Sequence, residues 1–386
     1  MKAVINGKII STNAVLTGKA VVFDRQIRAV IDESELSSRQ YGDVEIIDAG
    51  GMYVSPGLID VHIHGYLGRD ASDGDDAGLR TMAEGIVKNG VTAWLPTTMT
   101  VSTEELNAAF DSVRRAMKDN PRGAKILGVN AEGPFINAKY KGAQSEKHIL
   151  PPDASFIKRN LDVIRLFTIA CEIPGAIDVI KELSQTGVAI SLGHTAATYE
   201  EAMNAIEAGA GHITHLFNAM TPLNHRKPGV VTAALTSPVY AEIIADCFHV
   251  SPALFDMVAR LKGDKLLLIT DSTRAGGLED GEYTLGGQPI FVKGVECRLA
   301  DGTIAGSVLK LNHAVRNFLD NTSLPIETVV RMASLNPAKS IGVDDKKGSI
   351  EPGKDADIII VDERFNVKRT YISGELYYNN EESEPC

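Results

Sequence analysis

The sequence predicts an α/β protein with a central (β/α)8 barrel and a small β-sandwich domain built from both chain termini. Three observations lead to this prediction. Short apolar segments alternate with amphipathic ones through the middle of the chain, as in parallel sheets with crossover helices. Both ends are rich in short β-branched segments separated by turns. Histidine and acidic residues follow several of the apolar segments, where barrels place reactive groups.

The two ends of the chain have the same strand-rich texture. At the N-terminal end we expect strands over residues 3–5, 8–10, 20–23, 27–31 and 44–48. At the C-terminal end we expect strands over residues 356–361 and 367–373, followed by an acidic tail over 379–384 that frays. Because chain termini commonly lie close together, residues 1–54 and 348–386 are predicted to form one domain.

The middle of the chain, residues 55–347, is predicted to be the barrel. Its eight strands are expected over residues 58–64, 91–96, 126–131, 163–170, 188–192, 212–215, 241–245 and 266–270. Amphipathic helices are expected over residues 77–88, 103–118, 176–185, 198–208 and 252–261. Residues 281–302 contain two glycine turns and predict an inserted hairpin region. A doubly wound parallel sheet is the alternative fold.

Composition excludes several classes of protein. The net charge is −11 and no basic stripe offsets it, which argues against binding to nucleic acid. No segment approaches about 20 consecutive apolar residues, and the first residues do not have the pattern of a signal peptide. The four cysteines, Cys171, Cys247, Cys297 and Cys386, are scattered and are expected to be reduced thiols. We therefore expect a cytoplasmic protein with no membrane partner.

The first chemical signal is the His62-Ile63-His64 pattern at the end of the first predicted barrel strand. Residues two apart on a strand project to the same face, so both imidazoles point in one direction. Two imidazoles on one face form half of a divalent metal site. Alone, this pattern is weak.

Four further ligand-type residues strengthen it. Glu132 follows the third predicted strand, His194 the fifth, His215 the sixth and Asp271 the eighth. Since the C-terminal ends of barrel strands meet at one rim, these side chains are expected to converge there. Imidazole and carboxylate ligands suit one or two divalent ions of Zn, Fe, Mn or Co. Such an ion lowers the pKa of a bound water to about 7, and Asp271 is placed to move its proton.

Taken in order, the motifs around these residues resemble the amidohydrolase superfamily and, within it, the deacetylases of amino-sugar phosphates. The resemblance extends over essentially the whole chain. It is carried by residues 56–65, 132–135, 192–195, 215–220, 270–272 and 305–307.

The resemblance implies a role for each candidate residue. Glu132, His194 and His215 match the principal metal ligands, with Glu132 where many relatives carry a carboxylated lysine. Members that keep both histidines of the first motif can hold a second ion, and this chain keeps His62 and His64. Asp271 matches the catalytic acid and base. Substrate contacts are implied for Ala143, Gln144, Asn218, Ala219, Arg226, His249, Ile304, Ala305 and Gly306.

Two of these contacts imply an oligomer. Arg226 and His249 are expected to reach the neighbouring subunit's site, so a homodimer with a shared active site is expected. The planar guanidinium of Arg226 suits phosphate oxygens. The basic loop 224–229 around it also fits a cluster of solvated charges. Some members carry histidine where this chain has Gln144, which leaves open the group that polarises the acetyl carbonyl.

The implied reaction is hydrolysis of N-acetylglucosamine 6-phosphate to glucosamine 6-phosphate and acetate. Metal-bound hydroxide would attack, with Asp271 as general base and then acid. The alternatives are another amidohydrolase reaction, such as that of a deaminase or an N-acyl amino acid hydrolase, and a non-catalytic barrel scaffold. The set of Asn218, Arg226 and His249 favours a sugar phosphate, and the complete ligand set disfavours a scaffold.

Overall fold

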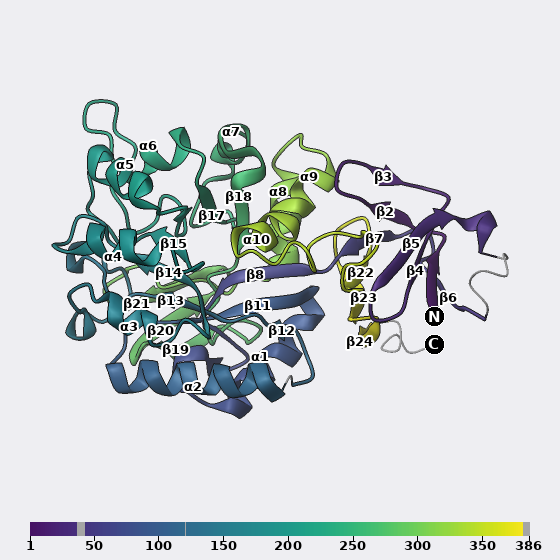
Figure 1. The fold of residues 1–386 in the computed structure, drawn as a ribbon, viewed down its shortest axis with the longest axis horizontal. Coiled ribbons are helices and arrows are strands. Elements are labelled where there is room, and N and C mark those ends of the chain that lie inside the picture. The colour runs from purple at the N-terminus through teal and green to yellow at the C-terminus, as the bar shows by residue number, and fades with distance from the viewer. Residues whose placement is uncertain (37–42, 120, 381–386) are drawn as a thin grey trace.

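The structure is a computed structural model that describes residues 1–36, 43–119 and 121–380. Figure 1 shows the barrel together with its helices on the left and a smaller all-β body, which holds both chain ends, on the right. The small body contains the purple N-terminal strands together with the yellow C-terminal ones.

Eight parallel strands form the barrel. In spatial order they are β8 (Leu58–Ile63), β11 (Val91–Thr98), β13 (Val129–Glu132), β14 (Ile164–Ile169), β15 (Ala189–Leu192), β16 (His212–Ile213), β17 (Tyr240–Ile244) and β18 (Leu266–Ile269). A short strand, β12 (Lys125–Ile126), also pairs with β11. Most residues of these strands are buried, because helices cover the outside of the sheet while side chains fill its interior.

The barrel closes between its first strand and the segment that follows its last. The amide of Asp271 donates to the carbonyl of His62 (2.8 Å), and the amide of His64 donates to the carbonyl of Ser272 (2.9 Å). Closure confirms the predicted (β/α)8 fold class and excludes the doubly wound sheet, whose edges stay open.

A layer of hydrogen-bonded polar side chains fills the barrel below its C-terminal rim. The hydroxyl of Thr214 lies 2.9 Å from that of Thr168 and 2.6 Å from that of Ser191. The side chain of Asn130 donates to the carbonyl of Val61 across the barrel (3.0 Å). These bonds satisfy the buried hydroxyl groups and the amide nitrogen of Asn130, whereas the Oδ1 atom of Asn130 has no partner among the described residues.

The helices lie outside the barrel strands. The predicted amphipathic segments correspond to α1 (Asp76–Ile86), α2 (Thr103–Asp119), α4 (Ala176–Leu183), α5 (Tyr199–Ala208) and α7 (Phe255–Lys262). A capping box between Thr198 and Glu201 starts α5.

Five helices were not predicted: α3 (Ala154–Lys158), α6 (Val230–Thr236), α8 (Leu311–Asp320), α9 (Ile326–Met332) and α10 (Leu335–Ser340). The short 3-10 helices are η1 (Glu33–Glu35), η2 (Ala71–Asp73), η3 (Val87–Asn89), η4 (Ala138–Tyr140), η5 (Glu146–His148), η6 (Pro252–Leu254) and η7 (Gly263–Lys265).

Two sheets form the small domain. One sheet holds, in spatial order, β5 (Ile27–Asp32), β4 (Lys19–Phe23), β1 (Lys2–Ile5) and β6 (Glu45–Asp48). The other holds β24 (Glu375–Asn379), β23 (Val367–Ile372), β22 (Ile358–Val361), β7 (Tyr53–Pro56), β2 (Lys8–Ile10) and β3 (Val15–Leu16). Side chains from both sheets share one apolar core, which confirms a β-sandwich built from both termini.

The domain limits, residues 1–54 with 348–386 and 55–347, remain our proposal. Strand β7 crosses the first limit, because it pairs with β22 and β2 and then leads into β8. The predicted fraying is wrong at Asn379, which pairs with Arg369 in the last strand pair. The rest of the expected tail beyond residue 380 lies outside the described residues.

Two small antiparallel sheets complete the fold. The predicted hairpin region is a three-stranded sheet of β19 (Gly281–Leu285), β20 (Gln288–Lys293) and β21 (Glu296–Leu299). The side chain of Gln288 donates to the carbonyl of Ala143 (2.7 Å), which ties this sheet to the loop after β13. The other sheet pairs β9 (Gly65–Tyr66) with β10 (Arg69–Asp70). None of the described helices combines the length and apolar character needed to span a bilayer.

The packing of α7 against α8 can be tested by truncating one aromatic side chain. Phe318 stacks on Phe255 with ring centroids 4.7 Å apart, and both rings are fully buried. We expect Phe318→Ala to lower the free energy of unfolding by about 3–5 kcal/mol, because it leaves a cavity. The control is Phe291→Ala in β20, where the ring is 44% exposed and the expected change is within about 0.5 kcal/mol. Urea unfolding followed by circular dichroism measures both, and equal losses would contradict the assignment.

Candidate metal centre and active site

Five barrel strands deliver six ligand-type side chains to the same rim. His62 lies in β8 and His64 follows its end, while Glu132 is the last residue of β13. His194, His215 and Asp271 each lie two residues beyond a strand, after β15, β16 and β18. All six side chains are nearly or fully buried.

Glu132 forms one group with two imidazoles. Its Oε1 lies 3.1 Å from Nε2 of His194 and 3.0 Å from Nε2 of His215. The two Nε2 atoms are themselves 3.1 Å apart. Three donor atoms that converge this closely form a ready divalent-ion site.

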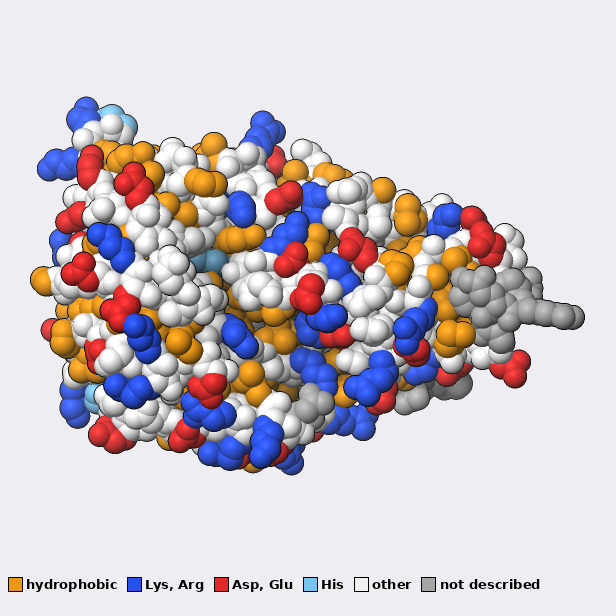
Figure 2. Space-filling view, in the orientation of Figure 1, with side chains coloured by type: hydrophobic (Ala, Val, Ile, Leu, Met, Phe, Trp, Pro, Cys, Tyr) orange, Lys and Arg blue, Asp and Glu red, His pale blue; other side chains and the backbone are white. Residues whose placement is uncertain are grey.

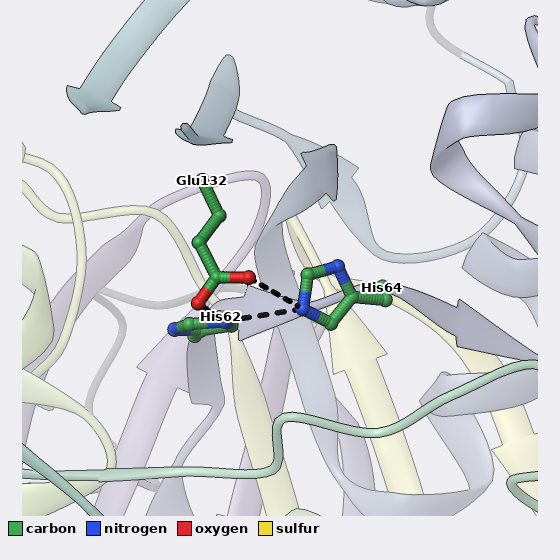
Figure 3. A group of neighbouring side chains, drawn as sticks. All are labelled: His62, His64 and Glu132. Carbon is green, nitrogen blue, oxygen red and sulfur yellow. Dashed lines mark hydrogen bonds and ion pairs between the residues drawn. The ribbon is translucent and has the colours of Figure 1, made fainter. Parts of the chain in front are cut away.

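The same carboxylate also belongs to a second group (Figure 3). Nε2 of His62 lies 3.4 Å from Oε1 of Glu132, and Nε2 of His64 lies 3.3 Å from Oε2. The two imidazole nitrogens are 3.4 Å apart. Glu132 therefore lies between two pairs of imidazoles. Its Oε1 atom faces His62, His194 and His215. Its Oε2 atom faces His64 and Gln144.

Asp271 completes the cluster. Its Oδ1 lies 3.2 Å from Nε2 of His64 and 3.5 Å from Nε2 of His62. Asp271 also lines the cavity described below, so its carboxylate faces both the imidazoles and the space where a substrate would sit.

The outer ring nitrogens show how each imidazole is held. Nδ1 of His64 donates to the carbonyl of Thr97 (3.1 Å), that of His194 to Tyr140 (2.9 Å), and that of His215 to Asn218 (3.1 Å). A proton fixed on Nδ1 leaves the lone pair of Nε2 directed into the centre. This is the orientation that metal-ligating histidines require.

His62 is held differently. Its Nδ1 donates to the carboxylate of Glu242 in β17 (2.9 Å). Glu242 is fully buried and also accepts from the amide of His215 (3.1 Å). On its other side lies His212, whose pKa burial lowers to about 4, so this imidazole is uncharged at neutral pH.

The cluster carries an excess of negative charge. Burial acts to lower the pKa of His62, but Glu242, Glu132 and Asp271 outweigh it and raise that pKa well above its usual value. Burial likewise opposes protonation of His64, yet Asp271 and Glu132 raise its pKa to about 10. Surroundings that bind protons so strongly also favour a divalent cation, which can take the place of those protons.

Backbone strain marks the rim. His194 (φ 48°), His215 (φ 29°) and Asp271 (φ 49°) adopt left-handed conformations that are uncommon for residues with side chains. Such strain costs of order 1–3 kcal/mol per residue and clusters at functional sites. Here it turns each side chain inward directly after its strand.

A cavity of about 410 Å³ opens above the cluster. Its floor includes His64, Glu132, His194, His215 and Asp271. Most of the sequence-predicted substrate contacts line its walls: Ala143, Gln144, Asn218, Ala219, His249, Ile304 and Gly306. The cavity has the size and the mixed polar and apolar lining of a small-molecule site.

Two predicted contacts lie elsewhere. Ala305 is fully buried beside Gly306 and does not line the cavity. Arg226 is exposed on the loop between β16 and α6, outside the cavity of its own chain. In Figure 1 this loop projects from the barrel, and in Figure 2 basic and histidine side chains gather at its tip. His249, in contrast, lines the cavity of its own chain, where Asp246 accepts from its Nδ1 (2.7 Å).

Several functional groups had escaped prediction. Main-chain carbonyls such as those of Thr97 and Tyr140 hold ligands through atoms that every residue carries. Lys139, in η4, and Phe217, inside the 215–220 motif, also line the cavity, although neither was singled out from the sequence. Glu242 had a readable signal, because a single carboxylate inside the apolar strand β17 is unusual for a buried parallel strand.

The residues fit a divalent metal. In each of the two groups, His62–His64–Glu132 and Glu132–His194–His215, the donor atoms lie within 4.8 Å of one another. Imidazole nitrogen and carboxylate oxygen are the ligand types of catalytic zinc and related ions. The shared Glu132 and the fixed Nδ1 protons agree with such a centre, so this is a divalent-metal site.

Comparisons with known proteins agree with this geometry. The model of the amidohydrolase family matches residues 53–377. The chain is 38% identical over 343 residues to N-acetylglucosamine-6-phosphate deacetylase of Lysinibacillus sphaericus, which covers 86% of this chain and 87% of the relative. It is 33% identical over 373 residues to N-acetylgalactosamine-6-phosphate deacetylase of Escherichia coli, and this alignment covers 95% of this chain and 98% of that relative.

A solved structure shares the whole fold. The crystal structure of N-acetylglucosamine-6-phosphate deacetylase from Pasteurella multocida superposes with a TM-score of 0.92 and 34% identity. The alignment covers 97% of this chain and 99% of that one. The similarity therefore includes the small β-sandwich as well as the barrel.

The assignment of metal ligands predicts that substitutions in the Glu132–His194–His215 group and substitutions of His62 and His64 remove different metal ions. Replacing Glu132, His194 or His215 singly by Ala should remove the tighter ion, because each substitution deletes one of its three ligands. The double change of His62 and His64 to Ala should reduce binding by about one ion per chain and leave the tighter ion in place. Metal analysis after dialysis at fixed free metal measures both. A double variant that loses all metal, beside a Glu132→Ala variant that retains it, would reverse the assignment.

Proposed function

The chain belongs to the amidohydrolase family, and from this premise we propose that it removes the acetyl group from N-acetylglucosamine 6-phosphate, giving glucosamine 6-phosphate and acetate. One observation carries the proposal: the cavity places Asp271 and a shared-carboxylate metal centre beneath walls lined with polar groups. The chain spans nearly all of the deacetylases it resembles, so the activity applies to the whole protein.

The metal centre is held by side chains already in position. Glu132, His194 and His215 would hold one divalent ion, and His62 and His64 would hold a second that shares Glu132. We propose Zn, Fe, Mn or Co as the ion. When bound, the metal supplies Lewis acidity, which activates water and polarises the acetyl carbonyl.

Asp271 moves the proton. Burial acts to raise the pKa of Asp271, but the His62 and His64 imidazoles hold that pKa below its ordinary value. Asp271 is thus a carboxylate at neutral pH and accepts a proton from the attacking water. As the new carbon–oxygen bond forms and the carbon–nitrogen bond breaks, Asp271 delivers that proton to the sugar nitrogen, which leaves as an amine.

Gln144 is engaged at both ends of its amide. Its Nε2 donates to Oε2 of Glu132, and its Oε1 accepts from the amide of Thr100 (2.6 Å). We therefore assign Gln144 to the orientation of Glu132 and assign the polarisation of the acetyl carbonyl to the metal. The two contacts of Gln144 support this proposal at a position where some members carry histidine.

The sugar phosphate would lie along the cavity walls. Asn218 and His249 offer hydrogen-bonding groups there, and Ala219, Ile304 and Gly306 shape the space around the ring. The position of Arg226 outside its own cavity supports the proposal that it serves a neighbouring subunit. We therefore propose a homodimer in which the projecting loop of one chain supplies a guanidinium to the phosphate bound by the other.

A cytoplasmic location also belongs to this proposal. It is supported by unpaired Cys171, Cys247 and Cys297 among the described residues.

The C4 epimer is the second candidate substrate. The chain covers 98% of a relative that acts, by its name, on N-acetylgalactosamine 6-phosphate. Acetate release from a panel of phosphorylated and unphosphorylated N-acetylhexosamines distinguishes the two. No acetate release from any phosphorylated member by the metal-loaded protein would contradict the proposed function.

Asp271→Asn tests the proton carrier. The amide keeps the shape of the side chain but cannot carry a proton. We expect retained metal content and a fall in kcat of about 10²–10⁴-fold, the usual contribution of general acid–base catalysis. Steady-state acetate release and metal analysis on the same sample measure both. Near-normal turnover would remove Asp271 from the mechanism.

Arg226→Ala tests phosphate capture. A shielded guanidinium–phosphate pair contributes at least ~2 kcal/mol, so kcat/KM for the 6-phosphate should fall by about 30-fold or more. The value for unphosphorylated N-acetylglucosamine should hardly change, because that sugar lacks the partner group.

Mixing the two impaired variants, with kcat/KM for the 6-phosphate as the readout, tests the shared site. Random exchange between Asp271→Asn and Arg226→Ala subunits forms mixed dimers, each with one intact site. Activity should then return to about a quarter of the wild-type value. Demonstrated exchange without recovery would mean that Arg226 serves its own chain or does not bind phosphate.

A further inference from the structure

Glu242 is a fully buried carboxylate with an unusual set of partners. Its Oε2 accepts from Nδ1 of His62 (2.9 Å) and from the amide of His215 (3.1 Å). Its Oε1 has no hydrogen bond and lies 3.6 Å from Nδ1 of uncharged His212. Among the described residues its ion pairs involve imidazoles only. A buried carboxylate without a lysine or arginine partner is costly, so a cation bound nearby would stabilise it.

His62 is set apart from the other three imidazoles by this contact. The Nδ1 atoms of His64, His194 and His215 donate to neutral main-chain carbonyls. Only His62 donates to a carboxylate, which binds its proton more strongly and makes the opposite nitrogen a better ligand. The opposite nitrogen, Nε2, faces Glu132 and Asp271.

The charges around His62 agree with a second ion. The carboxylates of Glu242, Glu132 and Asp271 all lie within 3.5 Å of its ring nitrogens. One divalent ion cannot balance three buried carboxylates, and the remaining negative charge lies on the His62 side of the cluster. A second divalent ion at His62 and His64 offsets this charge, which gives four positive charges against three negative ones.

We infer that Glu242 is a positioning residue that holds His62 as a ligand and thereby secures a second divalent ion in the His62–His64–Glu132 group. The inference deepens the proposed metal-dependent deacetylation and rests on it. Glu242 does not touch substrate; it acts through the imidazole it holds. It also reaches the other group through the amide of His215, so one side chain in β17 links both groups.

The Glu242→Gln variant removes the negative charge of the side chain but keeps its shape, so it tests the effect of the charge alone. The amide oxygen can still accept from His62 and from the His215 amide, but the negative charge is gone. We expect the second ion to bind about 10–100-fold more weakly, with the affinity of the first ion unchanged. Calorimetric titration of the metal-free full chain with Zn²⁺, together with metal analysis, measures both. Glu242→Asp, which keeps the charge but withdraws it by one methylene, should weaken the second ion too and serves if the glutamine variant does not fold.

Asp246→Asn is the matched control. Asp246 also holds an imidazole through Nδ1 (2.7 Å) just beyond the same strand, but that imidazole, His249, belongs to neither metal group. This variant should bind two ions as the wild type does. The absorption spectrum of the Co²⁺-loaded proteins gives a second readout, since loss of a ligand at one site changes the ligand-field bands of that site only.

The outcomes are distinct from those of the proposed function. Wild-type binding of no more than one ion, or second-ion affinities in both Glu242 variants equal to that of the wild type, would overturn the inference. Loss of the first ion to the same degree as the second would overturn it as well. Acetate release by the wild type tests the proposed function separately, because ion binding is measured without substrate.

Discussion

Closure of the barrel is the constraint on which the site depends. Main-chain hydrogen bonds join His62 to Asp271 and His64 to Ser272, and one layer below, the hydroxyl of Thr270 donates to Asp60 (2.7 Å). These contacts bring the first strand against the end of the last. Residues more than 200 positions apart in sequence therefore face one another, and the imidazoles meet Asp271 because the sheet has no edge.

Hydrogen bonds between the loops outside the rim hold the strained backbone conformation of His194 in place. Glu172 accepts from the amide of Ala196 (2.6 Å) and from the side chain of Asn137 (2.8 Å), which joins the loop after His194 to the loop after Glu132. The amide of Asn137 in turn donates to the carbonyl of His194 (2.9 Å). Because these bonds hold both loops together, the left-handed conformation of His194 is retained without help from its own backbone preference.

The sequence alone predicts those parts of the protein that depend on hydrophobic periodicity and on the position of residues at strand ends. The eight strands, the β-rich ends and the approach of His62, His64 and Asp271 follow from alternation and from the shared rim of parallel strands. Four of the five missed helices have seven residues or fewer, and α6 directly follows the loop that carries Arg226. The fifth, α8, has ten residues and was missed despite its length. The partners of the imidazoles were not predictable, because Thr97 and Tyr140 act through their carbonyls. Glu242 was overlooked because its strand reads as apolar core, although a lone carboxylate there is itself a signal.

The interior of the barrel separates neutral from charged polar groups. Thr168, Ser191 and Thr214 satisfy one another below the rim without charge, so that layer adds rigidity at little electrostatic cost. The carboxylates of Glu132, Asp271 and Glu242 lie above or beside it, and among the described residues they form ion pairs with imidazoles only. Imidazoles neutralise carboxylates by holding protons, and those protons occupy the same nitrogen lone pairs that a metal needs. Protons and divalent ions therefore compete for one set of atoms, at a place where none of the described residues forms an ion pair between these carboxylates and a lysine or arginine.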